Sequence, residues 1–156
     1  MVCLRTCVLA AGVIALNAVN AAPYERALPP VPIAIGGKEA SISEEFIELM
    51  KPDYDVVHVI NSAPVGKSEF IPLLKGEYTI PVTMLGSNFN NPNPKVPKAI
   101  FIGGGFAQSE IDEMYNVCSL QVVPWVYPPA GRSNGTVVPP TSFIAERVKA
   151  VFKENG

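Results

Sequence analysis

VPIAIGG (31–37) followed by SISEEFIELM (41–50) is the first copy of a unit that recurs along this chain and predicts its fold class. It joins an apolar run, a glycine turn and a segment with apolar residues at helical spacing. The same unit recurs as YDVVHVINS (54–62) with KSEFIPLL (67–74), KAIFIGGGF (98–106) with SEIDEMYNVC (109–118), and LQVVPWVYP (120–128) with TSFIAERVKAVFKEN (141–155). Strands that alternate with helices pair in parallel, so we expect an α/β fold. The expected form is a Rossmann-like or flavodoxin-like three-layer sandwich with a four-stranded, mainly parallel sheet.

Composition excludes some classes of protein. The 156 residues include 12 Lys and Arg against 14 Asp and Glu, a net charge of −2, so the chain lacks the excess of basic residues that nucleic-acid binding requires. The 16 prolines cluster between the predicted helices and strands, which favours stiff connections. This length suits one domain with its own core.

The first 21 residues have the three parts of a secretory signal peptide. Arg5 supplies a positive charge, Cys7–Leu16 is an apolar run, and Val19 and Ala21 are the small residues before a cleavage site. Because the run is shorter than the ~20 residues of a membrane-spanning helix, we expect no stable membrane insertion. The predicted division is signal peptide 1–21, extended leader 22–30 and single α/β domain 31–156.

Two further features bear on localisation. Asn134-Gly-Thr136 is a glycosylation sequon in the proline-rich loop before the last helix, which agrees with secretion. Removal of a signal peptide would leave Cys118 as the remaining cysteine, and we expect it to be a small buried apolar side chain. If residues 7–16 are instead a buried first strand, the protein would be cytoplasmic.

The connection 76–97 is long for a compact domain. It contains the strand-like TIPVTML (79–85) and then a stretch rich in asparagine and proline. We expect it to wrap around an edge of the sheet, with a lid over the ligand crevice as the alternative.

Ligands of parallel α/β sheets bind at the carboxyl ends of the strands. If the strand order is 2-1-3-4, the loops after the first three strands share one crevice. The candidate ligand-binding residues are Gly36, Gly37, Lys38, Asn61, Ser62, Gly103, Gly104, Gly105 and Trp125.

Each group of candidates has a structural alternative. Gly103–Gly105 could bring an anion to a helix N-terminus, but a tight turn without a ligand is the favoured interpretation. Lys38 could bind a carboxylate or phosphate, or be an ordinary surface lysine. Trp125 could wall a ring-shaped ligand, or cover the core. Asn61 stands where a P-loop requires glycine, so phosphate hydrolysis is not expected.

No catalytic constellation is evident. His58, the one histidine, lies in the middle of a strand, where a buried and hydrogen-bonded core residue is more typical than a base. The chain has no C-x-x-C motif and no G-x-S-x-G motif, so we expect neither a metal site nor a hydrolase nucleophile. Catalytic residues and cofactor remain unassigned.

The segments VPIAIGGKE, AIFIGGGF and VVPWVYPP resemble those of small single-domain Rossmann-like or flavodoxin-like proteins of filamentous fungi. The resemblance is one of general pattern over most of residues 30–155. It implies no activity and transfers no catalytic residue, and it favours an intracellular protein over a secreted one.

These observations indicate a non-catalytic accessory protein that binds a partner or a small anionic or aromatic ligand at the strand ends. The first alternative is a small tailoring enzyme that acts on an organic acid or aromatic metabolite, with Lys38 or Ser62 polarising the substrate. A protein that binds a nucleotide cofactor and a structural surface protein are two further alternatives. The oligomeric state stays open.

Overall fold

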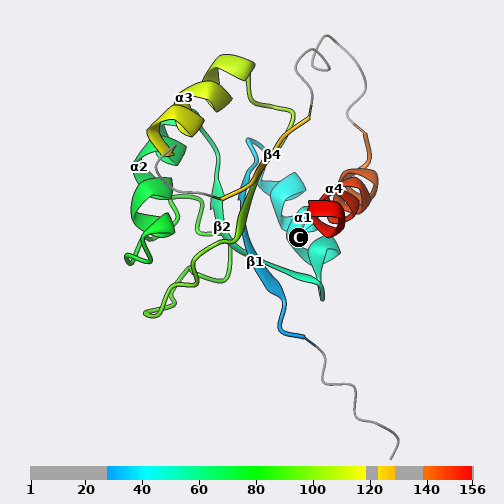
Figure 1. Ribbon diagram of the computed structural model, residues 1–156, viewed down its shortest axis with the longest axis horizontal. Helices are drawn as coiled ribbons and strands as arrows, with labels where there is room; N and C mark the ends of the chain where they lie inside the picture. The colour runs from blue at the N-terminus through cyan, green and yellow to red at the C-terminus, as the bar shows by residue number, and fades with distance from the viewer. Residues whose placement is uncertain (1–27, 119–122, 129–138, 156) are drawn as a thin grey trace, which may run out of the picture.

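The computed structural model describes residues 28–118, 123–128 and 139–155, which form a parallel four-stranded sheet between two pairs of helices (Figure 1). The strand order is β2-β1-β3-β4. The strands are β1 (Val31–Gly36), β2 (Tyr54–Ile60), β3 (Ala99–Ile102) and β4 (Trp125–Val126). The helices are α1 (Ala40–Met50), α2 (Ala63–Leu74), α3 (Gln108–Cys118) and α4 (Thr141–Asn155). The predicted α/β three-layer fold is confirmed.

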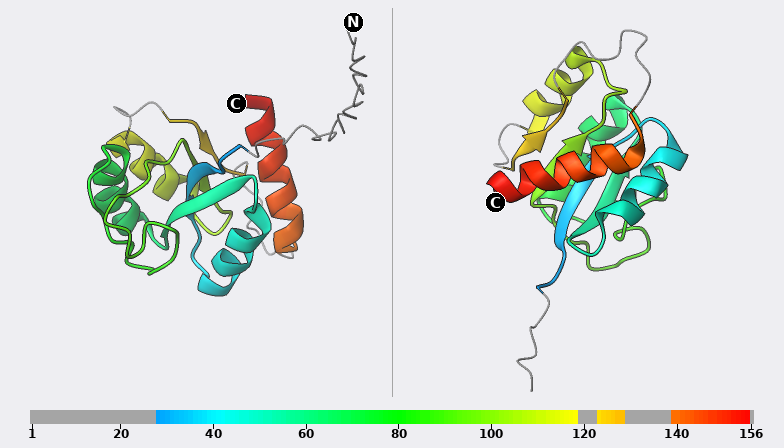
Figure 2. Two further views of the ribbon diagram at one scale, coloured as in Figure 1. Left: turned by 90° about the horizontal axis from the view of Figure 1, so that it is seen from below. Right: turned by 90° about the vertical axis from the view of Figure 1, so that its right-hand side faces the viewer.

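The helices cover the two faces of the sheet in pairs, α1 with α4 and α2 with α3 (Figures 1 and 2). Right-handed crossovers explain this division. The crossover through α1 leads from β1 to β2, and those through α2 and α3 lead in the opposite direction along the sheet, to β3 and β4. Crossovers of the same hand that run in opposite directions place their helices on opposite faces. On the first face, the rings of Phe46 and Phe101 stack 5.2 Å apart. On the second, Phe70, Ile100 and Met114 are fully buried. Apolar burial on both faces explains why the strands are continuous apolar runs.

The bounds of two elements differ from the sequence prediction. Helix α2 begins at Ala63, four residues before the predicted start, because Pro64 suits a first helical turn. Of the predicted strand 120–128, the described residues pair only at Trp125 and Val126.

Residues 76–97 wrap around the outer edge of β2, as expected. The backbone N–H groups of Ser87 and Asn88 donate to the carbonyls of Val56 and Val57, at 3.0 and 2.9 Å. Consecutive carbonyls of a regular strand point to opposite sides, and here a bulge in β2 turns both outward. TIPVTML is not a strand, because Pro81 lacks an N–H to pair and Met84 has φ 59°.

Cys118 is buried at the end of α3, and this burial raises the pKa of its thiol. It is the small apolar residue that the sequence predicted. Within the described part of the chain, no helix is both long enough and apolar enough to cross a membrane. The predicted signal peptide and the sequon at Asn134 lie outside the described residues.

Candidate functional site

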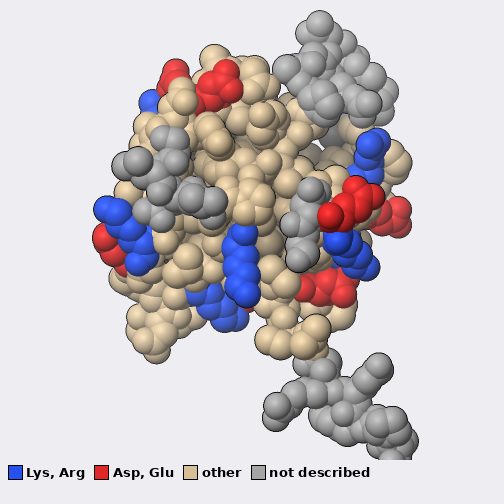
Figure 3. All heavy atoms as spheres, viewed as in Figure 1, with Lys and Arg blue, Asp and Glu red and all other residues tan. Residues whose placement is uncertain are grey.

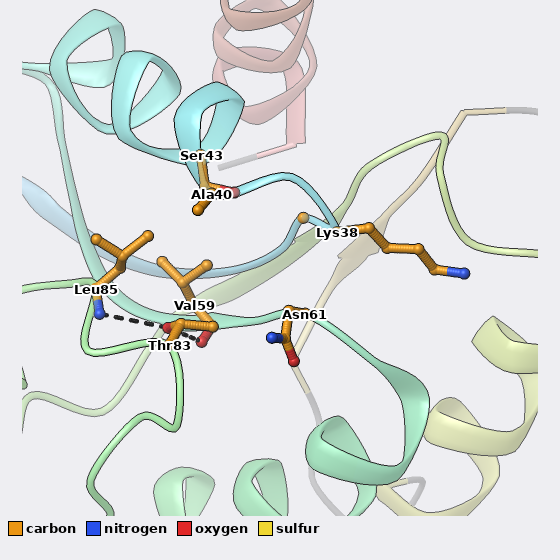
Figure 4. A pocket seen from close by; sticks show the side chains of 8 residues that line it. Lys38, Ala40, Ser43, Val59, Asn61, Thr83 and Leu85 are labelled. Atoms are coloured by element: carbon orange, nitrogen blue, oxygen red, sulfur yellow. Dashed lines mark hydrogen bonds between the residues drawn. The ribbon is translucent and has the colours of Figure 1, made fainter.

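A cavity of about 140 Å³ lies at the carboxyl ends of β1 and β2 (Figure 4). The start of α1 forms one wall, and the residues that follow β2 and the wrapping connection form the others. The lining residues are Gly37, Lys38, Ala40, Ser43, Val59, Asn61, Thr83 and Leu85. The cavity therefore brings together three of the candidate residues, Gly37, Lys38 and Asn61, with two residues of the connection 76–97.

Close packing at the end of β1 shapes the first wall. The N–H of Gly37 donates to the carbonyl of Ile60, 2.9 Å away, which ties the loop after β1 to the end of β2. A Cβ atom on Gly37 would overlap the Ser43 hydroxyl, so the position requires glycine. Ser43 is buried, and its hydroxyl donates to the carbonyl of Glu39 at 3.0 Å. Because its proton is used in this bond, the Ser43 hydroxyl can serve a ligand only as an acceptor.

Thr83 attaches the connection 76–97 to the end of β2 beside the cavity. Its hydroxyl donates to the carbonyl of Val59 at 2.7 Å and accepts the N–H of Leu85 at 3.3 Å (Figure 4). Both bonds fix the wall that Thr83 and Leu85 provide. The lid alternative for the connection 76–97 allowed such a contact, but no pattern singled out Thr83 and Leu85, since their place depends on contacts with β2.

Asn61 directly follows β2 and is exposed at the mouth of the cavity. Its side-chain amide makes no hydrogen bond to any other residue within the described ranges. An amide carries both donors and an acceptor. Among the side chains of the lining, Asn61 is therefore the one free both to donate a hydrogen bond to a polar ligand and to accept one from it.

Lys38 points away from the other lining side chains (Figure 4). Its ammonium donates to both carboxylate oxygens of Glu110, at 2.9 and 3.1 Å, and lies 4.9 Å from the centre of the Phe106 ring. The side chain thus crosses from the end of β1 to the loop after β3. Between these two strands the order of the sheet reverses, and this is where ligands of such folds commonly bind.

The loop Gly103–Gly105 is closed by the protein itself. The N–H of Gly103 donates to the carbonyl of Gly36 at 2.8 Å, and the Lys38 side chain lies against Gly105. The Glu110 carboxylate accepts the N–H of Ala107 at 2.7 Å, at the start of α3. This bond, with the pairing to Lys38, holds the Glu110 pKa below its ordinary value. The chain's own carboxylate therefore occupies the position that an anion would take at this helix.

Two other candidates lie outside the cavity lining. Ser62 precedes α2, and its carbonyl accepts the N–H of Gly66 at 2.9 Å. Trp125 packs edge-on against Phe70 and Tyr115, with ring centres 5.6 Å apart in both pairs. Trp125 therefore covers the core on the face of α2 and α3, which was the structural alternative for this residue.

His58 and Glu69 form a buried pair between β2 and α2. Nε2 of His58 lies 2.7 Å from Oε2 of Glu69, and Oε1 of Glu69 accepts the N–H of Val82 at 3.1 Å. His58 is fully buried, so it is the hydrogen-bonded core residue that the sequence indicated. Nδ1 of His58 is buried without a hydrogen-bond partner in the described structure. Among those residues no cluster of three or more His, Cys, Asp or Glu side chains could hold a metal ion.

Charged side chains are scattered over the face shown in Figure 3. Acidic and basic groups alternate there, and neither sign forms a continuous area. Charged side chains of the described residues also pair with one another, such as Lys67 with Glu113 at 2.8 Å and Lys95 with Asp55 at 2.6 Å. The described residues on this face therefore form no basic track of the kind that binds a nucleic-acid backbone.

Comparison with known proteins finds a fungal relative. The chain is 31% identical over 88 residues to the "Kojic acid related protein 6" of Aspergillus oryzae (strain ATCC 42149 / RIB 40). The match covers 55% of this chain and 50% of the relative, so the chain spans about half the length of the curated relative it matches. No family model matches the chain, and no solved structure matches it.

Proposed function

We propose that this protein is a non-catalytic accessory protein that binds a small molecule in the cavity at the ends of β1 and β2. The observation that carries the proposal is the unpaired Asn61 amide at the mouth of this cavity, between the apolar walls of Val59 and Leu85. Small-molecule sites typically combine apolar walls with a few well-placed polar groups.

The arrangement of Lys38 favours binding over catalysis. A lysine that polarises a substrate needs a free ammonium inside the site, whereas Lys38 points outward and pairs with Glu110. Ser62, the other residue considered for this role, does not line the cavity. An enzyme that relied on both residues would lose turnover in the double variant Lys38→Ala, Ser62→Ala. The accessory role predicts that this variant still binds ligand.

The printed name of the fungal relative supplies a first probe for binding, kojic acid, which is a small oxygen heterocycle. A panel of single-ring compounds that includes kojic acid is titrated into ¹⁵N-labelled protein. We expect at least one compound to shift the amide signals of Asn61, Thr83 and Leu85 and to raise the melting temperature. A panel in which no compound does either contradicts the proposed function.

The proposed place of action is outside the cell. The three-part pattern of residues 1–21 and the sequon at Asn134 support this location. The test is the intact mass of the protein from a eukaryotic secretion host. Secreted protein that has lost residues 1–21 is the expected product. A full-length, unmodified chain retained in the cells would contradict secretion.

A further inference from the structure

We infer that the cavity at the ends of β1 and β2 selects a neutral, single-ring molecule with a carbonyl oxygen, in place of the anionic ligand that the sequence also allowed. This inference rests on the proposed function, because it names the class of ligand for the same site. Three properties of the cavity support it: its volume, its charge and its hydrogen-bonding groups.

The volume limits the ligand to one ring. The cavity measures about 140 Å³. An apolar cavity of about 150 Å³ inside a protein accommodates one benzene molecule. A second fused ring does not fit this volume. It would have to displace Thr83 or Leu85, which hydrogen bonds to Val59 and within the connection hold in place, or extend out of the open mouth into solvent and lose its contacts with the walls.

The charge near the cavity disfavours an anion. Lys38 is the one charged residue in the lining, and both Glu110 oxygens neutralise its ammonium. Glu39, an acidic residue, stands at the N-cap of α1 directly before the lining residue Ala40. An anionic ligand would therefore lose part of its hydration without an unpaired cation to replace it, whereas a neutral ligand avoids this cost.

The hydrogen-bonding groups match a carbonyl. The hydroxyls of Ser43 and Thr83 already donate, to the carbonyls of Glu39 and Val59. The Asn61 amide is therefore the side-chain donor that remains free in the lining, and it can bind a ligand oxygen. The oxygens of Asn61 and Ser43 can in turn accept an N–H or O–H of the ligand. A flat ring with one carbonyl and one donor satisfies these groups between apolar walls.

Three probes separate these properties: benzamide, benzoate and 2-naphthamide. Benzamide and benzoate have the same size and differ in charge, while 2-naphthamide adds a ring to benzamide. Each is titrated into the ¹⁵N-labelled full chain at pH 6.5, where benzoate is ionised. We expect benzamide to shift the signals of Asn61, Thr83 and Leu85 with an affinity at least tenfold higher than that of benzoate. We expect 2-naphthamide to bind at least tenfold more weakly than benzamide at these residues, because its second ring exceeds the cavity volume.

Two variants test the named groups. Asn61→Leu keeps the side-chain size and removes the amide, so benzamide affinity should fall at least tenfold. The matched control is Asn93→Leu in the connection, an exposed asparagine outside the cavity lining, which should leave affinity within twofold. Glu110→Gln removes the charge that neutralises Lys38 and releases its ammonium to turn toward the cavity, so the variant should raise benzoate affinity at least threefold and change benzamide affinity less than twofold.

The outcomes distinguish this inference from the proposed function. The inferred ligand class is wrong if benzoate binds as tightly as benzamide, or if 2-naphthamide binds tightly. Either result is still compatible with the proposed small-molecule site. The same holds if benzamide fails to bind while another compound of the panel shifts Asn61, Thr83 and Leu85. An unchanged benzamide affinity in Asn61→Leu overturns the assigned donor. Absence of any shift with all compounds overturns both conclusions.

Discussion

Nε2 of His58 lies 2.7 Å from Oε2 of Glu69, and both side chains are buried between β2 and α2. The second oxygen of Glu69 holds the N–H of Val82, so this pair connects β2, α2 and the connection that forms one wall of the cavity. Within the described residues the imidazole is fully buried, and it does not line the cavity. The pair therefore stabilises the wall of the site rather than catalysing a reaction.

Glu69→Leu should lower the free energy of unfolding by about 2–3 kcal/mol. The substitution removes hydrogen bonds to a carboxylate and leaves buried groups of His58 and Val82 unsatisfied. Glu69→Gln should cost less, because its amide can still accept the N–H of Val82 and donate to His58. Urea unfolding measures both values, and hydrogen exchange at Val82 should be faster in Glu69→Leu than in Glu69→Gln.

The matched control for this prediction is Glu113→Gln. Glu113 also pairs with a basic side chain, Lys67, but both groups are exposed. Exposed pairs contribute about 0–1 kcal/mol, so this variant should unfold close to the unchanged protein. If Glu69→Leu and Glu113→Gln lower the free energy of unfolding equally, burial of the His58–Glu69 pair does not explain its contribution to stability.

Gly86→Ala should destabilise the protein by about 1–3 kcal/mol and weaken ligand binding. A Cβ at Gly86 would lie 2.5 Å from the carbonyl oxygen of Val57, and the residue has φ 102°, where side chains are strained. The connection must then move away from β2, and Leu85 moves with it. Urea unfolding and benzamide titration measure the two effects.

Gly104→Ala is the control for Gly86→Ala. Its added Cβ would meet the Pro128 ring at 3.6 Å, which is an ordinary contact. We expect a change within about 0.5 kcal/mol. If Gly104→Ala lowers the free energy of unfolding as much as Gly86→Ala does, the loss at Gly86 does not come from the contact with Val57 and the positive φ.

Glu110→Gln should make stability less dependent on acid pH. The folded-state pKa of Glu110 lies below its ordinary value of 4.5, so its ionised form stabilises the fold. This contribution is complete above the unfolded-state pKa and is lost as the pH falls through the lower folded-state value. At pH 7 the variant should be about 0.5–1 kcal/mol less stable.

Urea unfolding from pH 7 down to pH 2.5 tests this prediction. The stability difference between the two proteins should shrink as the pH falls below 4.5. A difference that stays constant over the whole range would contradict a stabilising carboxylate at the start of α3.

Trp125→Ala should separate stability from binding. Loss of the indole removes the contacts with Phe70 and Tyr115, and a half-buried ring of this size should cost roughly 2 kcal/mol. Benzamide affinity should stay within twofold, because Trp125 packs on the face of α2 and α3. If a folded Trp125→Ala variant binds benzamide more than fivefold more weakly, Trp125 contributes to the ligand site after all.

Much of the fold was predictable from local patterns. Apolar runs such as VPIAIGG and YDVVHVI predict strands because parallel strands are buried on both faces, and the helical spacing after each run predicts α1, α3 and α4. The strand-like TIPVTML was misleading, since the place of this segment is set by hydrogen bonds to β2 rather than by its own pattern.

The candidate site was predictable only in part. The glycine turn after β1 and the asparagine after β2 mark the strand ends, and both line the cavity. The pairing of Lys38 with Glu110 joins residues 72 positions apart, and spacing along a chain carries no information about such a contact. The burial of Glu69 depends on its contact with His58 of β2, which no local pattern indicates.

The wrapping connection also bears on the behaviour of this protein at high concentration. Strand β2 is long and rich in valine, and an uncovered edge of this kind offers a template for pairing with other chains and for amyloid-like association. Ser87 and Asn88 occupy the carbonyls of Val56 and Val57 at this edge. By covering this edge, residues 76–97 should hinder the pairing of β2 with other chains. A shortened connection should therefore lower the solubility of the protein even where the domain still folds.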